Sequence, residues 1–350
     1  MKLTIERATL ARLLANVGRV VESRNTIPIL GFVLLEASQD GLRVTGTDLD
    51  IVATDRAPAE TTTDGAICVD AKLLSDIAKK AGGDISISLE ADKLVVKSGR
   101  SRFSLQTLPA ADFPSLDGGK FDASFEIDLA ALFAPVAFAI SNDDVRYYLQ
   151  GVYFASSEAV SVAVATDGHR LARHKAASLG TFPGVIVPKK VVGLLPKGVA
   201  AVSVSTTKIR IAIGDFTLVS KLIDGTFPDY ERVIPRENEL AVTADKAELL
   251  RAADRVTTVS NERGRAVKLS VASGSIGLSV HSQVGDAQDE VATEYSGEPA
   301  EIGFNSVYLR DALSAMADGQ VTLSLRDAGS PALLTGQSEA LDITLMPMRV

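Results

Sequence analysis

Apolar positions recur in two rhythms along this chain, one typical of helices and the other typical of strands. Between residues 10 and 21 they follow the three- and four-residue spacing of an amphipathic helix. Residues 85–89 and 209–213 alternate apolar with polar side chains instead, which predicts strands that bury one face. Short polar turns separate the strands, so we expect antiparallel sheets with helices on one face, an α+β fold.

The same order of patterns occurs three times along the chain. Each copy opens with a short strand and an amphipathic helix, and the copies begin at Leu3, Phe125 and Leu240. A second helix follows in each copy, after strands that begin at Ile67, Val185 and Glu301. A fixed spacing of similar elements indicates internal repetition. We therefore predict three similar domains, at residues 1–120, 121–237 and 238–350.

Residues 162–172, with the sequence VAVATDGHRLA, form the most distinctive stretch of the chain. The apolar alternation stops at Asp167-Gly168, which predicts a strand that runs into a turn. Residues 44–53, VTGTDLDIVA, have the same shape, and Thr47-Asp48 precedes Thr166-Asp167 by 119 positions. This turn therefore supports the internal repeat.

The first helix of two copies carries cations opposite its apolar stripe. These cations are Arg12, Arg19, Arg251 and Arg255. A single basic helix face is usually only solvated, but a face that recurs favours a shared polyanionic partner. Strands at domain boundaries must also pair with something, and a closed ring of domains removes free edges. In such a ring the cations would line the hole and contact a polyanionic rod through its phosphates, independently of base sequence.

Charge and helix composition qualify this picture. The net charge of −8 divides into −1, 0 and −7 for the three predicted domains, so the acidity lies in the third. The helix that begins at Leu129 has no cation, and Pro135 within it predicts a bend. Net charge describes the whole surface, so an acidic protein can still carry a basic strip.

Enzyme chemistry is not indicated by the sequence. A hydrolytic triad could use Asp167 and His169, but no GxSxG nucleophile motif is present. A metal site could use His169 and His174, but their spacing of five places them on different helix faces, and there is no CxxC or HExxH motif. Phosphate-binding glycine motifs are also absent from the sequence. We expect no catalytic residue, metal or cofactor.

Cysteine content and targeting signals point to the cytoplasm. Cys68 is the one cysteine, so disulfides within the chain are excluded, and its apolar neighbours predict a buried structural thiol. The N-terminus lacks the apolar core of a signal peptide, and no apolar run approaches the ~18 residues that a membrane span needs.

Six motifs, in order along the chain, carry a family resemblance. They are SGRSRFSLQTLPAADFP (98–114), VRYYLQGV (145–152), ATDGHRLA (165–172), VPKK (187–190), FPDYERVIP (227–235) and the terminal MPMRV (346–350). Together they closely resemble the bacterial β sliding clamps, the processivity subunits of DNA polymerase III. The resemblance covers all three repeats.

The resemblance implies a DNA clamp fold with three similar domains per chain, each with two helices facing a central pore. It implies a head-to-tail homodimer, a ring around double-stranded DNA that an ATP-driven loader opens and closes. Partners would be the DNA polymerase III catalytic subunit, the clamp loader, other polymerases and repair proteins, all through short linear motifs, in the cytoplasm at the nucleoid. The alternative is a peptide-binding scaffold of the same fold that does not bind DNA.

The resemblance also assigns residues. It implies a partner-peptide groove of Leu149, Thr166, Gly168, His169, Arg170, Leu171, Pro228, Arg232, Val233, Asn305, Tyr308, Met346, Pro347, Met348, Arg349 and Val350. Leu171, Leu149, Val233 and Met346 would form an apolar pocket for a Leu or Phe anchor, with Arg and His at its rim. For DNA it implies Arg24, Lys72, Tyr148, Lys189 and Lys190, in addition to the four helix arginines. Gly264 stands where the best-known member has an aromatic residue, and Asp143-Asp144 where that member has one acid, which implies a shallower groove wall and a less positive bore.

Overall fold

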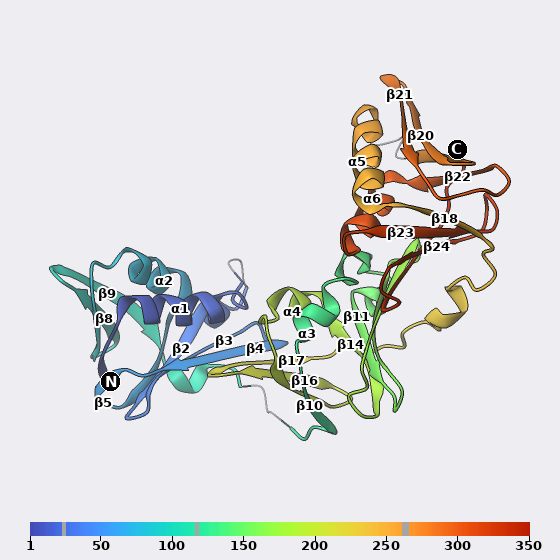
Figure 1. The fold of residues 1–350 in the computed structure, drawn as a ribbon. Coiled ribbons are helices and arrows are strands. Elements are labelled where there is room, and N and C mark those ends of the chain that lie inside the picture. The colour runs from blue at the N-terminus through green and yellow to red at the C-terminus, as the bar shows by residue number, and fades with distance from the viewer. Residues whose placement is uncertain (23–25, 116–118, 261–265) are drawn as a thin grey trace. The chain divides into compact units, whose positions relative to one another are not determined.

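The computed structural model describes residues 1–22, 26–115, 119–260 and 266–350. The chain forms two compact units, each built from two segments (Figure 1). Unit 1 contains Met1–Asp128 and Gly193–Leu222, and unit 2 contains Leu129–Val192 and Ile223–Val350.

Unit 1 contains a 13-stranded sheet with the order β10-β15-β16-β17-β4-β3-β2-β6-β9-β8-β7-β1-β5. Its strands are β1 (Lys2–Ile5), β2 (Phe32–Ser38), β3 (Gly41–Thr47), β4 (Ile51–Ala57), β5 (Glu60–Thr63), β6 (Gly65–Asp70), β7 (Ile85–Glu90), β8 (Lys93–Ser98), β9 (Ser101–Leu108), β10 (Ala123–Ile127), β15 (Ala200–Val204), β16 (Lys208–Ile213) and β17 (Phe216–Lys221). Helices α1 (Arg7–Gly18) and α2 (Ala71–Lys80) lie side by side over part of this sheet (Figure 1).

Unit 2 contains an eight-stranded and a four-stranded sheet, with the orders β14-β11-β12-β13-β25-β24-β23-β18 and β21-β20-β19-β22. The strands of the first sheet are β11 (Gly151–Ser156), β12 (Ser161–Thr166), β13 (Arg170–Ala176), β14 (Phe182–Pro188), β18 (Leu240–Asp245), β23 (Gln320–Leu325), β24 (Ala332–Gly336) and β25 (Leu341–Leu345). Those of the second are β19 (Ala266–Ala272), β20 (Ser275–Ser282), β21 (Gly285–Ala292) and β22 (Ala300–Asn305). Its helices are α3 (Leu129–Phe133), α5 (Lys246–Val256) and α6 (Ser306–Ala315), and α4 (Lys189–Leu194) crosses the boundary between the units along the chain.

The second sequence repeat is divided between the two units, because its strands pair with strands of both neighbouring repeats. Strand β17 pairs antiparallel with β4, from Thr217↔Thr54 to Ser220↔Ile51. Strand β13 pairs antiparallel with β25, from Arg170↔Leu345 to His174↔Leu341. Strands at the repeat boundaries therefore do find partners, and hydrogen bonding continues across the boundaries instead of stopping there.

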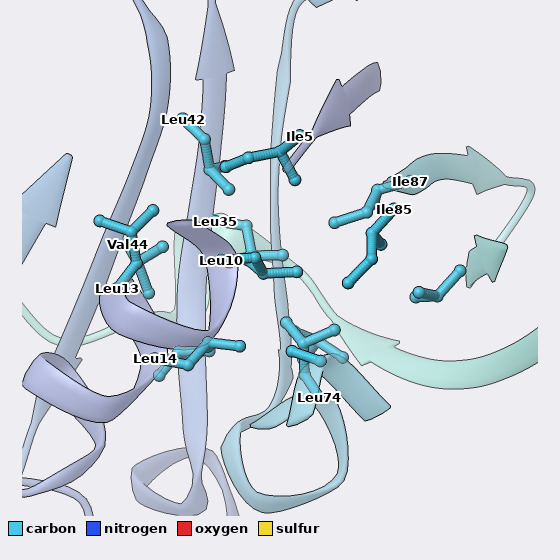
Figure 2. Close-up of a cluster of buried hydrophobic side chains, with 14 of the residues drawn as sticks. Ile5, Leu10, Leu13, Leu14, Leu35, Leu42, Val44, Leu74, Ile85 and Ile87 are labelled. Atoms are coloured by element: carbon cyan, nitrogen blue, oxygen red, sulfur yellow. The ribbon is translucent and has the colours of Figure 1, made fainter. Parts of the chain in front are cut away.

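The apolar stripe of α1 is buried as its spacing predicts. Leu10, Leu13, Leu14 and Val17 are all at most 2% exposed. Figure 2 shows three of these leucines between Leu35 and Val44 of the sheet on one side and Leu74 of α2 on the other. Each fully buried side chain of this size contributes roughly 1.5–3 kcal/mol relative to an exposed one, so this cluster fixes α1 on the sheet. Arg12 and Arg19 consequently lie away from the core.

The helix beginning at Leu129 bends where proline predicts. Helix α3 ends at Phe133, and a separate 3-10 turn, η3 (Ala137–Ala139), follows Pro135. Proline has no N–H to continue the helical ladder, so the chain leaves the helix before it.

Cys68 is fully buried within β6, and burial raises the pKa of its thiol to about 11. The thiol is therefore uncharged at neutral pH, which suits the predicted structural role.

No helix in the described part of the chain is long and apolar enough to cross a membrane.

Candidate functional site

The turn between β12 and β13 is held by its own polar side chains. Asp167 Oδ1 accepts hydrogen bonds from the backbone N–H groups of His169 (2.9 Å) and Arg170 (3.0 Å). Thr166 Oγ1 donates to the Arg170 carbonyl at 2.7 Å and accepts from the Gly168 N–H at 3.1 Å. Gly168 has φ +88°, a left-handed conformation that glycine adopts without strain. Thr166, Asp167 and Gly168 therefore shape the turn.

The equivalent turn between β3 and β4 repeats this pattern atom for atom. Asp48 Oδ1 accepts from the N–H groups of Asp50 (3.0 Å) and Ile51 (2.7 Å), as Asp167 does in the later turn. Thr47 Oγ1 donates to the Ile51 carbonyl at 2.8 Å and accepts from the Leu49 N–H at 3.0 Å. Leu49 takes the left-handed conformation, φ +80°, that Gly168 takes in the second repeat. The Thr-Asp turn is thus a structural unit of the repeat, and function in the second copy must come from its surroundings.

Arg170 is tied into the fold, although the sequence places it at a groove rim. Its side chain is 11% exposed and forms ion pairs with Asp167 at 3.0 Å and Asp311 at 2.6 Å. The guanidinium also lies 4.5 Å from the centre of the Tyr308 ring and 5.2 Å from that of Phe138. A guanidinium that makes two ion pairs and stacks on two rings anchors α6 and η3 to the turn.

The other predicted groove residues on this side also have structural partners. The His169 ring stacks on Tyr308, with centroids 6.1 Å apart. Asn305 is the N-cap of α6 and accepts from the N–H groups of Val307 and Tyr308. Leu149 and Leu171 are both 3% exposed, so neither side chain presents an open apolar surface. His169 and Tyr308 therefore form a wall supported by buried neighbours.

The Asp167–His169 pairing that a hydrolytic triad needs is not formed in the described structure. The Asp167 carboxylate bonds two backbone N–H groups and Arg170 rather than the imidazole. His174 Nδ1 lies 2.9 Å from the Leu132 carbonyl oxygen, so this ring has a structural hydrogen-bond partner. No group of three or more His, Cys, Asp or Glu side chains that could hold a metal ion occurs within the described residues.

A pocket of about 750 Å³ lies beside the C-terminal tail in unit 2. The segment 229–238 forms one side, including the 3-10 turn η5 (Tyr230–Val233), and Arg326, Ser330, Pro331 and Met346 complete it. Of the predicted groove residues, Arg232, Val233 and Met346 line this pocket. Ile234, which also lines it, packs in one buried cluster with Leu171. Leu171 therefore supports the pocket floor from behind.

The pocket rim is charged, with each arginine matched by an acid. Arg232 pairs with Asp229 at 2.7 Å, Arg236 with Glu231 at 3.8 Å, and Arg326 with Glu237 at 3.6 Å. These pairs are solvent-exposed and therefore weak, so a bound group can replace them at small cost. Sequence reasoning missed Asn238, Arg326, Ser330 and Pro331, since they lie on irregular loops whose only sequence signal is proline and polar composition.

The C-terminal tail, residues 346–350, leaves β25 and keeps apolar side chains in solvent. Met346 is 44%, Met348 39% and Val350 64% exposed. The Met346 N–H donates to the His169 carbonyl at 2.9 Å, and the Met348 N–H donates to the Gly303 carbonyl at 2.8 Å. The tail is therefore fixed at two backbone points and presents flexible thioether side chains, which adapt to different ligands.

Three of the predicted DNA-binding cations lie in unit 1, Arg12 on α1, Arg19 directly after the end of α1, and Lys72 on α2. Arg12 Nη1 donates to Asp55 Oδ2 at 2.9 Å, and Arg19 Nη2 donates to the Gly193 carbonyl. Lys72 is exposed on α2. Arg19 and Lys72 line one cleft of about 570 Å³ between the two helices, together with acidic side chains such as Asp76. Arg24 lies outside the described residues, as does Gly264.

The remaining predicted DNA-binding residues lie in unit 2. Lys189 Nζ donates to Asn142 Oδ1 at 2.6 Å, and Tyr148 packs edge-on against Tyr147. Arg251 is exposed on α5. Arg255 binds Asp289 at 2.6 Å, and this hydrogen bond is the main reason that the pKa of Asp289 lies below its usual value. Asp289 stays ionised at neutral pH and offsets part of the Arg255 charge.

Asp55 is a buried carboxylate, 0% exposed, and its partners come from α1 and its own strand. Its Oδ2 accepts from Arg12 (2.9 Å) and Asn16 (2.8 Å), and its Oδ1 accepts from the Arg56 N–H (2.8 Å). The sequence pattern predicts Arg12 as one of the cations on the polar face of α1. In the structure half of its side chain is covered, and its charge is matched by Asp55.

Arg12→Ala is expected to lower the free energy of unfolding by about 1–3 kcal/mol, because Asp55 would stay buried without its cation. Urea titration followed by circular dichroism measures the change. Arg7→Ala, on the same helix but with one long contact to the Lys79 carbonyl at 3.4 Å, is the matched control and should change stability far less. Equal effects for the two variants would contradict a structural role for Arg12.

Three protein-family models match successive parts of the chain. They are described as the N-terminal, central and C-terminal domains of the DNA polymerase III beta subunit, and they match residues 1–117, 126–229 and 231–349. The proteins named Beta sliding clamp from Caulobacter vibrioides (strain NA1000 / CB15N) and Escherichia coli (strain K12) are 42% and 36% identical to this chain, and both comparisons cover 100% of each chain.

Solved structures agree with these matches over the whole chain. The DnaN sliding clamp (DNA polymerase III subunit beta) from Bartonella birtlesii bound to griselimycin has a TM-score of 0.97 and 39% identity. The DNA polymerase III subunit beta from Pseudomonas aeruginosa has a TM-score of 0.95 and 38% identity. Each covers 100% of both chains.

Proposed function

Because the chain belongs to the bacterial β sliding clamps, the beta subunits of DNA polymerase III, we propose that it encircles duplex DNA as a ring-shaped homodimer. The ring tethers the replicative polymerase and so makes DNA synthesis processive. The expected three-domain clamp fold with antiparallel sheets is confirmed by the family matches and the TM-scores. The observation that carries the proposal is that all three domains of this family occur, in order, over the full length of the chain.

The domain boundaries that fit this function are 1–120, 121–237 and 238–350, and in our proposal two helices of each domain face the pore. Arg19, Lys72, Lys189, Lys190 and Arg251 then contact DNA phosphates, with Arg12, Arg24, Tyr148 and Arg255 beside them. Arg12 and Arg255 have acidic partners, so they contribute less positive charge. Weak contacts are sufficient, because a closed ring is held on DNA by topology. The protein acts in the cytoplasm at the nucleoid and catalyses no reaction.

The pocket beside the tail is the site for partner peptides. It takes an apolar Leu or Phe anchor against Val233, Ile234 and Met346, while the charged rim orients polar groups of the peptide. The wall is completed by Thr166, Gly168, His169, Arg170, Pro228, Asn305, Tyr308 and Pro347 to Val350, with the buried Leu149 and Leu171 supporting it from behind. The polymerase III catalytic subunit, the clamp loader, and other polymerases and repair proteins would compete for it. Griselimycin, which the Bartonella birtlesii clamp binds, is a suitable competitor.

The dimer is head-to-tail, and two strand edges support this arrangement. Strand β9 pairs with β8 along residues 101–106, but with β6 only at Thr107 and Leu108. Among the described residues, the second side of Ser101–Gln106 has no strand partner, and Phe103 there is 39% exposed. Strand β21 ends the four-stranded sheet and carries Asp286, Asp289 and Glu290. Arg102 on β9, with Arg100 just before the strand, makes this edge basic. It is complementary to the acidic edge of β21, and pairing between two chains closes a ring.

The test is retention on DNA after loading by a bacterial clamp loader and ATP. The protein should remain on nicked circular DNA through gel filtration at high salt and should be lost from the same DNA after it is cut once. Equal loss from both forms, together with intact peptide binding, would favour a peptide-binding scaffold that does not encircle DNA. Only a topological link distinguishes circular from linear DNA of the same sequence.

A further inference from the structure

Gly303, on β22, lies where the C-terminal tail touches the body of unit 2. Its carbonyl accepts the Met348 N–H at 2.8 Å, and the two residues form an isolated antiparallel bridge. On its other side, Gly303 pairs with Lys268 of β19. The tail therefore adds a short piece of strand to the outer edge of the four-stranded sheet.

The contact depends on the missing side chain at position 303. A Cβ there would lie 2.6 Å from the Met348 carbonyl oxygen and 2.9 Å from Val350 Cγ2, and it would collide with Val350 Cγ1. Carbon atoms do not approach so closely, and the Met348 oxygen belongs to the backbone, so the tail itself would have to move. Gly303 does not have a positive φ, so alanine brings no backbone strain of its own.

Backbone hydrogen bonds hold the tail at Met346 and at Met348, only two residues apart. The short segment between these two anchors has little conformational freedom. The Met346 N–H is bound to the His169 carbonyl and the Met348 N–H to that of Gly303. Pro347, between them, has a fixed φ and no N–H. Displacement of the second anchor therefore displaces the chain next to Met346, whose side chain lines the pocket.

We propose that Gly303 is a positioning residue for peptide binding: it provides the seat on which the tail lies, and thereby holds Met346 at the pocket. The inference rests on the proposed peptide-binding function of that pocket. Gly303 contacts no peptide itself, because it acts through the tail. The residue at position 303 therefore has to lack a side chain, and none of its chemical groups takes part in binding.

The experiment is a double-mutant cycle with Gly303→Ala and a variant that lacks Met348–Val350. The probe is a fluorescein-labelled peptide with a Leu-Phe end, measured by fluorescence polarisation, with griselimycin as a second ligand. We expect Gly303→Ala to weaken binding on the order of tenfold in the full chain and to have no further effect in the truncated chain. Gly277→Ala, on β20 of the same sheet, is the control, because its Cβ would meet Ser270 atoms at an ordinary 3.7–3.8 Å.

Unchanged peptide affinity in Gly303→Ala would overturn the inference. The same weakening in the full and truncated chains would overturn it too, because the effect would then pass through the sheet and not through the tail. A readout independent of peptide binding is the rate at which carboxypeptidase releases Val350, which should rise in Gly303→Ala and not in Gly277→Ala. If the parent chain binds neither ligand, the proposed function fails, and the carboxypeptidase rate still decides whether Gly303 seats the tail.

Discussion

A chain that lacks Met346–Val350 is expected to lose binding of the Leu-Phe peptide by at least on the order of a hundredfold, while its dimer stays intact. Met346 forms part of the pocket wall, and the tail carries two more exposed apolar side chains, Met348 and Val350. Their removal leaves the anchor of the peptide in solvent on one side, and a few such contacts dominate binding energy. Fluorescence polarisation measures the affinity, and sedimentation velocity measures the dimer.

Val284→Ala is the control for this deletion. Val284 is 74% exposed and lies in the β20–β21 hairpin rather than at the pocket, so its loss removes exposed apolar surface without touching the site. Peptide affinity should be unchanged in that variant. A deletion that binds the peptide as tightly as the full chain would refute the assignment of the tail to the groove.

Phe103→Asp is expected to weaken the dimer by roughly a hundredfold. The substitution places a carboxylate on the open edge of β9, where our proposal brings the acidic strand β21 of the second chain. It removes an apolar contact and adds like-charge repulsion, two effects that together amount to about 2–3 kcal/mol. Sedimentation velocity over a concentration series gives the dissociation constant, and loss of the ring should also abolish retention on circular DNA.

Leu49→Asp provides a matched comparison, since Leu49 is 40% exposed and Phe103 39%. Leu49 lies on the β3–β4 turn and has a left-handed φ, which aspartate tolerates. This variant should dimerise as the parent chain does. If both variants remain dimers at micromolar concentration, β9 is not the dimer edge.

The local pattern of apolar and polar residues was sufficient to predict those elements whose contacts are made between near neighbours in sequence. The α1 stripe is buried from Leu10 to Val17, although the helix ends at Gly18, before the predicted Val21, which is only partly buried. The bend at Pro135 occurs because proline acts on its own turn. The two Thr-Asp turns have the same hydrogen bonds because each turn closes within four residues. Periodicity and turn chemistry act over such short distances, so they are readable without a structure.

The site was harder to predict because its residues are distant in sequence. From the sequence, Arg170 is expected at the rim of the peptide groove with its charge available to a ligand. In the structure it pairs with Asp311 of α6, which is 141 residues away in sequence. Arg12 reads as one of a row of cations, but it is bound by a buried aspartate on β4. The pocket loop at Ser330-Pro331 has no periodicity, and only strand pairing between β24 and β25 places it beside Met346.

The sequence by itself determined the threefold repeat, the amphipathic helices and the family, because these depend on spacing and on motifs that lie within single segments. The tertiary structure alone decided which cations stay unpaired, how the second repeat is shared between two units, and that a glycine on β22 lies beneath the tail. Those features depend on contacts between segments that are distant in sequence, from 34 residues for Arg255 and Asp289 to 141 for Arg170 and Asp311, or on the absence of an atom. Neither distant contacts nor a missing side chain produces a periodic pattern of residues that could be recognised in the sequence.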